Sequence, residues 1–146
     1  MDPQSRFQEF VRQHHGRLTP QRQFIVKEFL SLSGHYSIQD LHDHFRQKGK
    51  RINPSTIFRT LKLLVAAGIA VERQFGNGSA IYEINVAHHD HMICLACGKI
   101  VEFDNPQLES LQGRIIRKMG FTMAYHKHEI YGYCRLCAKK SKGTPH

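Results

Sequence analysis

Residues 53–84 read NPSTIFRTLKLLVAAGIAVERQFGNGSAIYEI. Asn53 is a favoured N-cap residue followed by proline at the first helical position, and apolar residues then recur at helical spacing until Gly68, a residue suited to ending a helix. Beyond Gly68 the apolar residues alternate with polar ones in two short runs, separated by a glycine-flanked turn at 76–78. The stretch therefore predicts a helix followed by a β-hairpin.

Two further helices are predicted before this stretch. Thr19-Pro20 repeats the pattern of an N-cap followed by proline, and the helical apolar spacing continues to Gly34. Ser37, with an aspartate three residues later, has the pattern of a capping box, and the helix it opens is expected to end near Gly49. Three helices followed by a hairpin indicate a winged helix-turn-helix, which we assign to residues 1–84.

The outward face of the third predicted helix carries side chains suited to DNA. In a winged helix-turn-helix this helix enters the major groove, where hydroxyl and guanidinium groups contact bases and phosphates and an aromatic ring packs on thymine methyl groups. The net charge of +9 also indicates an anionic partner. The alternative is a solvated amphipathic helix, but an exposed phenylalanine is unusual on such a face. The candidate DNA-binding residues on this face are Ser55, Thr56, Phe58 and Arg59.

The four cysteines form two Cys-x-x-Cys pairs, Cys94 with Cys97 and Cys134 with Cys137. Two intervening residues let both sulfurs of a pair reach one ion, and four thiolates make a closed tetrahedral zinc site. Gly98 suits the tight turn after the first pair. The alternatives are two disulfides, disfavoured without a secretory signal, and a redox motif, of which there would have to be two. We expect a structural Zn²⁺ bound by all four cysteines.

Residues 88–94 read HHDHMIC and run into the first cysteine pair. If this run is extended, successive side chains point to opposite faces, so His89 and His91 share one face while His88 and Asp90 share the other. Imidazole and carboxylate ligands suit Fe(II), Mn(II), Ni(II) or Zn(II). The alternative is a solvated histidine-rich loop with weak surface binding of metal. The alternation predicts that one short strand contributes to two metal sites.

The rest of the C-terminal sequence predicts a small sheet with one helix. Residues 100–103 alternate as a strand, Asn105-Pro106 opens a helix with an apolar stripe, and residues 121–125 alternate as a further strand. The expected fold class is therefore α+β, with an N-terminal winged helix-turn-helix domain followed by a small C-terminal α/β domain that carries the four-cysteine zinc site.

The domain boundaries follow from these elements. We assign residues 85–87 to a short hinge, 88–138 to a dimerisation and metal-binding domain and 139–146 to a basic tail. One small sheet with one helix buries little apolar surface, so this domain is expected to complete its core by dimerising.

Two classes of protein are disfavoured by the sequence. No apolar run approaches the roughly 20 residues of a transmembrane helix, and the first residues lack the apolar region of a secretory signal. We therefore expect a cytoplasmic protein with no membrane partner. An enzyme is the other alternative, either a thiol oxidoreductase or a metal hydrolase, but no nucleophile or phosphate-cradling motif accompanies the histidine run.

In chain order, the residues from His88 to Gly98, followed by Glu102, Glu109, His126 and the second cysteine pair, resemble the ferric uptake regulator family of bacterial metal-responsive repressors. Residues 17–22 and 54–59 fit the DNA-binding domain of that family, and the resemblance covers residues 10–137. It implies a homodimer that binds double-stranded DNA at AT-rich palindromic operators when loaded with metal.

The resemblance also implies two sets of metal ligands and one more DNA contact. The regulatory site would tie the DNA-binding domain to the dimerisation domain and would comprise His35, Glu83, His89, His91 and Glu102. An additional site, which agrees with the strand alternation, would comprise His88, Asp90, Glu109 and His126. Arg17 lies before the first predicted helix and is a candidate DNA contact. The histidines without a position in the pattern are His14, His15, His42, His44 and His128.

Two departures from the family pattern bear on function. Phe58 stands where many members have tyrosine, which removes a hydroxyl donor from the DNA-binding face. Glutamate stands at both 83 and 102, where peroxide-sensing relatives typically have aspartate, and no cysteine is left for the regulatory site, where zinc sensors often use one. The resemblance therefore favours a repressor of metal-uptake genes that responds to Fe²⁺, with Mn²⁺ or Zn²⁺ as the alternatives.

Overall fold

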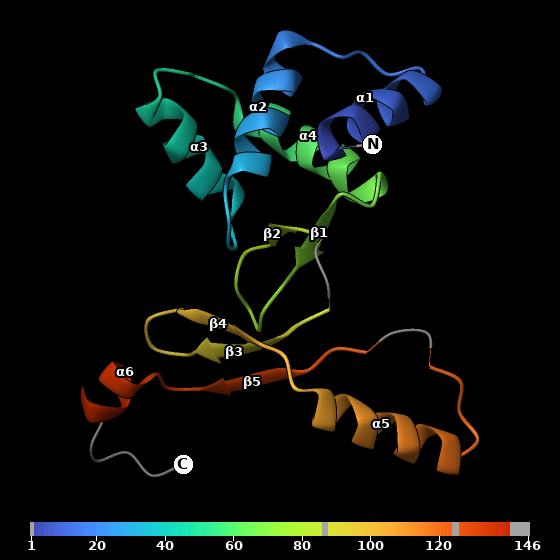
Figure 1. Ribbon diagram of the computed structural model, residues 1–146. Coiled ribbons are helices and arrows are strands. Elements are labelled where there is room, and N and C mark those ends of the chain that lie inside the picture. Colours follow the sequence, from blue (N-terminus) through green and yellow to red (C-terminus); the bar gives the residue numbers. More distant parts are fainter. Residues whose placement is uncertain (1, 86–87, 124–125, 141–146) are drawn as a thin grey trace. The chain divides into compact units, whose positions relative to one another are not determined.

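The computed structural model describes residues 2–85, 88–123 and 126–140, and the chain divides into two compact units, Met1–Val86 and Ala87–His146. Within the described residues, the first unit has four helices and a hairpin, and the second has a three-stranded sheet and two helices; Figure 1 labels these elements. Among the described residues, every helix is too short or too polar to traverse a lipid bilayer. The mixed fold class and the winged helix-turn-helix are confirmed.

The N-terminal unit contains the three predicted helices, each begun by the predicted cap. They are α2 (Pro20–Ser31), α3 (Ile38–Gln47) and α4 (Pro54–Ala66). Thr19 and Asn53 each accept a hydrogen bond from a first-turn backbone N–H of α2 and α4. Both hydrogen bonds of the capping box between Ser37 and Asp40 are present at the start of α3.

One helix of this unit was missing from the sequence analysis. Helix α1 (Pro3–Gln13) begins at Asp2, whose side chain accepts a hydrogen bond from the backbone N–H of Ser5. Only Phe7 and Val11 of this helix are buried, at positions i and i+4. Two apolar positions are too few for a sequence periodicity, so the helix was recognisable only from its cap.

The core of the N-terminal unit lies between the helices and the hairpin. Helix α4 packs against α2, α3 and strand β1, and ends at Gly68, which has a φ of +71°. Strands β1 (Ala70–Arg73) and β2 (Ile81–Ile84) then pair antiparallel, as predicted. The side chains that are less than 2% exposed in this core include Ile25, Phe29, Leu41, Phe45, Ile57, Leu61, Leu64 and Tyr82.

A pair of backbone hydrogen bonds attaches the loop before α3 to strand β2. Tyr36 N donates to Tyr82 O over 3.0 Å, and Tyr82 N donates to Tyr36 O over 2.8 Å. In an antiparallel ladder, the pair next to such a hydrogen-bonded pair has its side chains close together on one face. His35 and Glu83 are that neighbouring pair, so the bridge positions them opposite one another.

The C-terminal unit is built on a three-stranded sheet in the order β4-β3-β5. Strand β3 (Asp90–Cys94) pairs antiparallel with β4 (Ile100–Phe103) and parallel with β5 (Glu129–Gly132). Helix α5 (Pro106–Lys118) lies between β4 and β5 in the chain, and α6 (Arg135–Lys140) follows β5. The predicted strand at 100–103 and the predicted helix from Pro106 are both present.

The predicted strand at 121–125 is wrong. Residues 121–123 form no strand, because they belong to the close of α5: Gly120, two residues after the helix, has a φ of +69°, and the N–H of Phe121 donates to Ile116 O. Tyr125 lies outside the described residues, and the third strand of the sheet is β5, further along the chain.

The predicted tail begins later than expected. Lys139 and Lys140, assigned above to the tail, belong to α6. Residues 86–87 of the hinge and 141–146 of the tail lie outside the described residues.

The apolar stripe of α5 is exposed within the single chain. No residue of α5 is buried, and Leu111, Ile115 and Met119 are 46%, 50% and 75% exposed. On the same unit Val101 of β4 and Ile130 of β5 are 39% and 45% exposed. An exposed apolar stripe such as that of α5 usually marks a protein–protein interface.

The capping box of α3 provides a test of the fold. We expect Ser37→Ala to destabilise the protein by about 1 kcal/mol, since it leaves the backbone N–H of Asp40 without its acceptor. Urea denaturation followed by helical circular dichroism measures the change. The control is Ser33→Ala, an exposed serine in the loop before α3. Equal stabilities of the two variants would contradict the role of the cap.

Candidate metal centres and DNA-binding face

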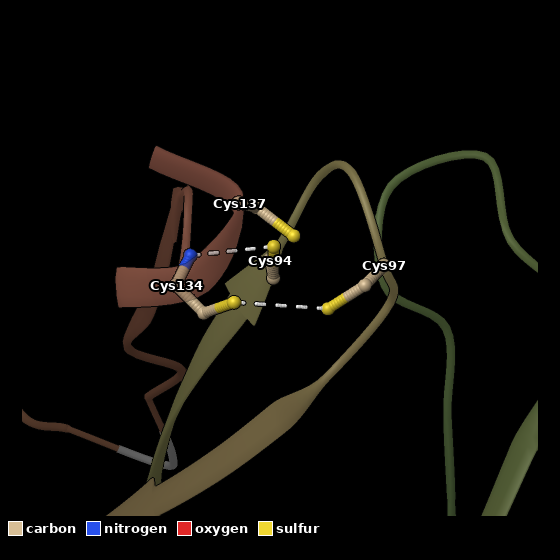
Figure 2. A group of neighbouring side chains, drawn as sticks. All are labelled: Cys94, Cys97, Cys134 and Cys137. Carbon is tan, nitrogen blue, oxygen red and sulfur yellow. Dashed lines mark hydrogen bonds between the residues drawn. The ribbon is translucent and has the colours of Figure 1, made fainter. Parts of the chain in front are cut away.

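The four cysteine side chains converge at one end of strand β3. Cys94 is the last residue of β3, Cys97 lies in the turn that follows, and Cys134 and Cys137 lie at the start and in the first turns of α6. Figure 2 shows the four sulfurs pointing toward one another, and all four lie within 4.8 Å of each other. Sulfurs bound 2.3 Å from one tetrahedral ion lie about 3.8 Å apart, so the cluster has the size of a zinc site.

The turn between Cys94 and Gly98 is tight. Gly98 has a φ of +76°, and its N–H donates to Cys94 O over 2.9 Å. Cys94 N donates to Lys99 O over the same distance, which closes the end of the β3–β4 hairpin. This local backbone brings the first two sulfurs together, and β5, paired with β3, delivers the other two.

The environment of the sulfurs favours partial ionisation. A hydrogen bond from the backbone N–H of Cys134, 3.3 Å from Cys94 Sγ, lowers the pKa of Cys94 to about 6. Hydrogen bonding with the Cys134 thiol, together with burial, raises the pKa of Cys137 to about 12. Ionisation of all four thiols together would require a cation to offset the repulsion between the thiolates. All four cysteines are free, and the Cys97 and Cys134 sulfurs are 3.9 Å apart, so no disulfide joins them.

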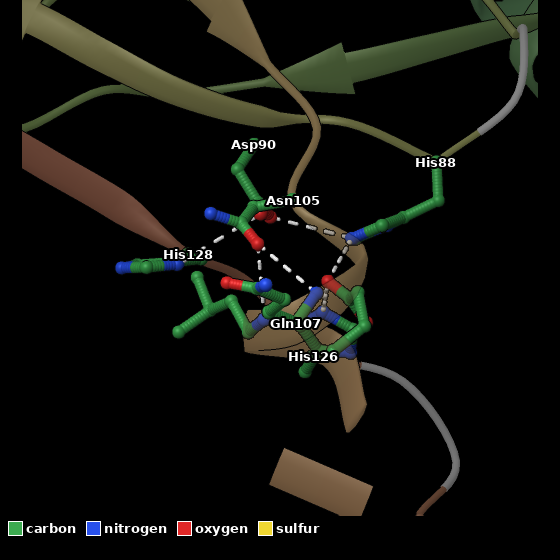
Figure 3. Close-up of polar contacts among 8 residues, drawn as sticks. His88, Asp90, Asn105, Gln107, His126 and His128 are labelled. Carbon is green, nitrogen blue, oxygen red and sulfur yellow. Dashed lines mark hydrogen bonds and ion pairs between the residues drawn. The ribbon is translucent and has the colours of Figure 1, made fainter. Parts of the chain in front are cut away.

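A second cluster combines two histidines and two carboxylates within the C-terminal unit. Its members are His88, Asp90, Glu109 and His126, and their ligand atoms all lie within 4.8 Å of one another. The Nε2 atoms of His88 and His126 are 3.0 and 3.1 Å from Glu109 Oε1, and His88 Nε2 is 3.3 Å from Asp90 Oδ1. Figure 3 shows the side chains of His88, Asp90 and His126 pointing into one space. Two imidazoles and two carboxylates form a mixed N/O set that suits Fe(II), Mn(II) or Zn(II).

Helix α5 and the central strand β3 position the two carboxylates of the second cluster. Asn105 caps α5 by accepting hydrogen bonds from the N–H groups of Gln107 and Leu108, which positions Glu109 in the first turn. Burial raises the pKa of Glu109, but the hydrogen bonds with His126 and then His88 outweigh this effect and lower it. Asp90, on the central strand, is only 1% exposed.

His128 is a neighbour of this cluster that the sequence analysis left without a role. Its Nδ1 lies 3.8 Å from Asp90 Oδ2, and its ring packs against Phe103. Figure 3 shows it on the side of Asp90 away from His88. It lies just before β5, and the pairing of β5 with β3 brings it to Asp90. Because that pairing links residues far apart in sequence, no local signal could have identified His128.

His35 and Glu83 form a buried pair in the N-terminal unit. His35 Nε2 is 2.6 Å from Glu83 Oε2, and their side chains are 9% and 4% exposed. Arg73 Nε donates a hydrogen bond to the other carboxylate oxygen, Oε1. Burial raises the pKa of Glu83, but the hydrogen bonds from His35 and Arg73 outweigh it and lower the pKa to about 2. Glu83 is therefore ionised in the folded domain at neutral pH.

His89, His91 and Glu102 gather on one face of the sheet in the C-terminal unit. His91 is paired directly with Glu102 in the β3–β4 register, and His89, two residues before His91, points to the same face. The rings of His89 and His91 are 4.7 Å apart, and His89 Nε2 is 3.6 Å from Glu102 Oε1. His88 and Asp90 point to the opposite face, into the second cluster.

The candidate DNA-binding residues lie on the surface of the N-terminal unit. Phe58 is 44% exposed on α4, and Lys62 lies over its ring at 5.4 Å. Ser55, Arg59 and Arg17 are exposed and Thr56 is half-buried. The Ser55 hydroxyl donates to Asn53 Oδ1, so it is already engaged in capping α4. The face opposite the core is thus basic and aromatic, as the sequence pattern predicted.

Comparison with known proteins assigns the chain to one class of protein. Residues 13–131 match the model of the ferric uptake regulator family. The chain is 37% identical over 135 residues to the ferric uptake regulation protein of Campylobacter jejuni, covering 90% of this chain and 86% of that protein. It is 33% identical over 124 residues to the peroxide-responsive repressor PerR of Staphylococcus epidermidis, covering 85% and 83% of the two chains.

Solved structures agree with the sequence comparison. The Helicobacter pylori ferric uptake regulator Fur, whose structure reveals three functional metal binding sites, matches with a TM-score of 0.84 and 25% identity over 99% of this chain and 97% of that one. The chain belongs to the ferric uptake regulator family. It is a metal-responsive regulator of transcription, and because its relatives are transcription regulators, the enzyme alternative is excluded.

The cysteine cluster provides a test that separates structural from redox chemistry. We expect Cys97→Ser to release one metal ion per chain and to unfold the C-terminal unit or dissociate its dimer, because metal binding at such a site contributes to folding. Metal analysis, size-exclusion chromatography and thermal melts measure the three effects. A Cys97→Ser protein that is metal-free yet dimeric, with unchanged thermal stability, would contradict an architectural role.

Proposed function

We propose that this protein is a homodimeric, cytoplasmic repressor of metal-uptake genes that binds an AT-rich palindromic operator when it is loaded with ferrous iron. The observation that carries the proposal is the presence of two matching half-clusters of N/O ligands, one in each unit. His35 and Glu83 form the first, and His89, His91 and Glu102 form the second. We propose that the two half-clusters bind one regulatory ion together.

The mechanism follows from ligands contributed by both units. When His35 and Glu83 share an ion with His89, His91 and Glu102, the DNA-binding unit is restricted to one orientation relative to the dimerisation unit. In a homodimer this fixes the spacing of the two α4 helices, which must match successive major grooves roughly 34 Å apart. Metal-free protein samples other orientations and binds the operator more weakly.

A homodimer is supported by the exposed apolar surface of the C-terminal unit. Leu111 and Ile115 of α5 and Met119 at its C-cap form a stripe along one helix face that stays exposed among the residues the structure describes. A second copy of the same unit would bury it against an equivalent stripe, as isologous interfaces require. A two-fold axis between the copies is also what a palindromic operator matches.

We propose that the four cysteines hold a structural Zn²⁺ and that His88, Asp90, Glu109 and His126 form an additional metal site. The first assignment is supported by four convergent sulfurs, which leave no open coordination position. The second is supported by four converging N/O ligands, one of which, Asp90, is buried and ionisable. The chemistry of this second set does not separate iron, manganese and zinc.

Iron is proposed for the regulatory site because its ligands are imidazoles and carboxylates without a thiolate. Glutamate at 83 and 102, rather than aspartate, separates this chain from the pattern typical of peroxide sensors, although a PerR is among its relatives. Manganese and zinc remain the alternatives, and a titration of operator binding with each metal at fixed salt distinguishes them.

The DNA-binding face gives a prediction for two arginines. We expect Arg59→Ala on α4 to weaken operator binding by about 1–3 kcal/mol and to relax the preference at one base pair, because a guanidinium pairs with a base edge. Arg17→Ala should weaken binding evenly across sequences and lower the salt dependence by about one unit, because it removes a phosphate contact. Fluorescence anisotropy on operator variants at several salt concentrations measures both. Unchanged affinity in both variants would contradict this face.

The two faces of β3 give a prediction for sensing. We expect His91→Ala to abolish metal-activated operator binding while keeping the zinc bound by cysteines, because the imidazole and the four sulfurs belong to different sites. His88→Ala, on the opposite face, should have a smaller effect on activation. Metal stoichiometry and operator affinity are measured for both variants and for wild type. Equal loss from the two substitutions would mean that both histidines serve one site.

A further inference from the structure

Glu83 has two different partners, one on each carboxylate oxygen. His35 Nε2 faces Oε2, whereas Arg73 Nε donates to Oε1. Arg73 pairs with Ile81 in the hairpin register, so Glu83, two residues further on β2, is its diagonal neighbour on the same face of the hairpin. The Arg73 side chain is 22% exposed and that of Glu83 4%. The contact is therefore a largely buried ion pair within one rigid hairpin.

The charge on Arg73 is permanent. A guanidinium stays protonated throughout the accessible pH range, unlike an imidazole. A buried carboxylate without a compensating cation is strongly destabilising, so the hairpin stabilises the Glu83 anion in the absence of any metal. The metal-free domain thus contains a cation that already interacts with a proposed metal ligand.

A metal ion bound between His35 and Oε2 of Glu83 would share the carboxylate with this guanidinium. The hydrogen bond to Oε1 withdraws electron density from the carboxylate, and the positive charge repels a second cation nearby. The hydrogen bond also engages Oε1 of Glu83, which disfavours bidentate coordination of the ion by both carboxylate oxygens. The lost electron density, the charge repulsion and the engagement of Oε1 all act against metal binding.

We propose that Arg73 is a built-in counter-cation that restrains the affinity of the regulatory site for metal by competing for the charge of Glu83. The inference rests on the proposed function, since it takes Glu83 as a ligand of the regulatory ion. Arg73 is a positioning residue and not a ligand. Its physical effect is to raise the metal concentration at which the regulator responds.

The test measures metal binding directly, with Co(II) as the probe and full-length protein whose cysteine site is already filled with zinc. Chelator competition gives the dissociation constant, and the d–d absorption reports the coordination number. We expect Arg73→Gln, which keeps an N–H donor but removes the charge, to bind Co(II) about tenfold more tightly, the size expected when a neighbouring like charge is removed. Arg73→Lys, which keeps the charge, should stay within about threefold of wild type.

Lys48→Gln is the matched control for net charge. Lys48 pairs with Glu28 over 2.6 Å in the same unit, so its substitution removes one positive charge without touching Glu83. Its Co(II) affinity should equal that of wild type. Unchanged or weaker binding by Arg73→Gln, or a gain of equal size in Lys48→Gln, would overturn the inference.

A measurement on the wild-type protein tests the inference even if Arg73→Gln fails to fold. Coupling between two cations is reciprocal, so if Arg73 weakens metal binding, the metal must weaken the Arg73–Glu83 hydrogen bond by the same factor. The Arg73 Nε–H resonance, followed by NMR during titration with Zn(II) as a diamagnetic probe, should then exchange faster with solvent. An unchanged exchange rate of the Arg73 Nε–H proton at saturating Zn(II) would contradict the inference.

The variant His35→Ala distinguishes failure of the proposed regulatory site from failure of the role proposed for Arg73. If that variant binds Co(II) as tightly as wild type, His35 is not a ligand and the proposed function is wrong. If His35→Ala loses the ion while Arg73→Gln binds no more tightly than wild type, the regulatory site stands and the role of Arg73 fails.

Discussion

Strand β3 is hydrogen-bonded on both sides, to β4 and to β5, and this double pairing controls the chemistry of the C-terminal unit. A strand that is hydrogen-bonded on both edges cannot rotate about its own axis, so successive side chains stay on opposite faces of the sheet. His91 projects to one face and Asp90 to the other, and the strand ends at Cys94 in the cysteine cluster. One short element therefore contributes to three groups of metal-ligating side chains without mixing them.

Two of the proposed metal ligands, Asp90 and Glu83, are buried carboxylates whose negative charge needs compensation. Asp90 and Glu83 are 1% and 4% exposed; Asp90 faces His88 and His128, and Glu83 faces His35. Placing an anion in such surroundings is unfavourable unless a positive charge is near. Among the described residues, the imidazoles of His88 and His128 lie beside Asp90, whereas Glu83 has the permanent charge of Arg73. The two carboxylates are thus compensated to different degrees before any metal arrives.

The N-terminal unit combines a rigid scaffold with an exposed face. Caps at the starts of α2, α3 and α4 set the beginning of each helix, and a fully buried apolar core fixes their mutual packing. Phe58 and Lys62 are therefore presented from a helix that has little freedom to move within its unit. The bridge from Tyr36 to Tyr82 joins the loop before α3 to the hairpin, so His35 and Glu83 belong to the same scaffold.

The amino-acid sequence alone determined the features that depend on near neighbours in the chain. Caps, apolar periodicity and glycine turns located α2, α3, α4 and the hairpin, and the Cys-x-x-Cys spacing together with strand alternation predicted the cysteine cluster and the two faces of β3. Each of these signals is local because helix capping, strand pleat and metal-knuckle spacing act over a few residues.

Only the tertiary structure decided which distant residues meet. The strand expected at 121–125 was replaced by β5, because the N–H of Phe121 is engaged by the end of α5 and the parallel partner of β3 lies further along the chain. The approach of His128 to Asp90 follows from that pairing, and the contact of Arg73 with Glu83 follows from the register of the hairpin. Such contacts depend on strand pairing and burial, which a single sequence does not encode in any local pattern.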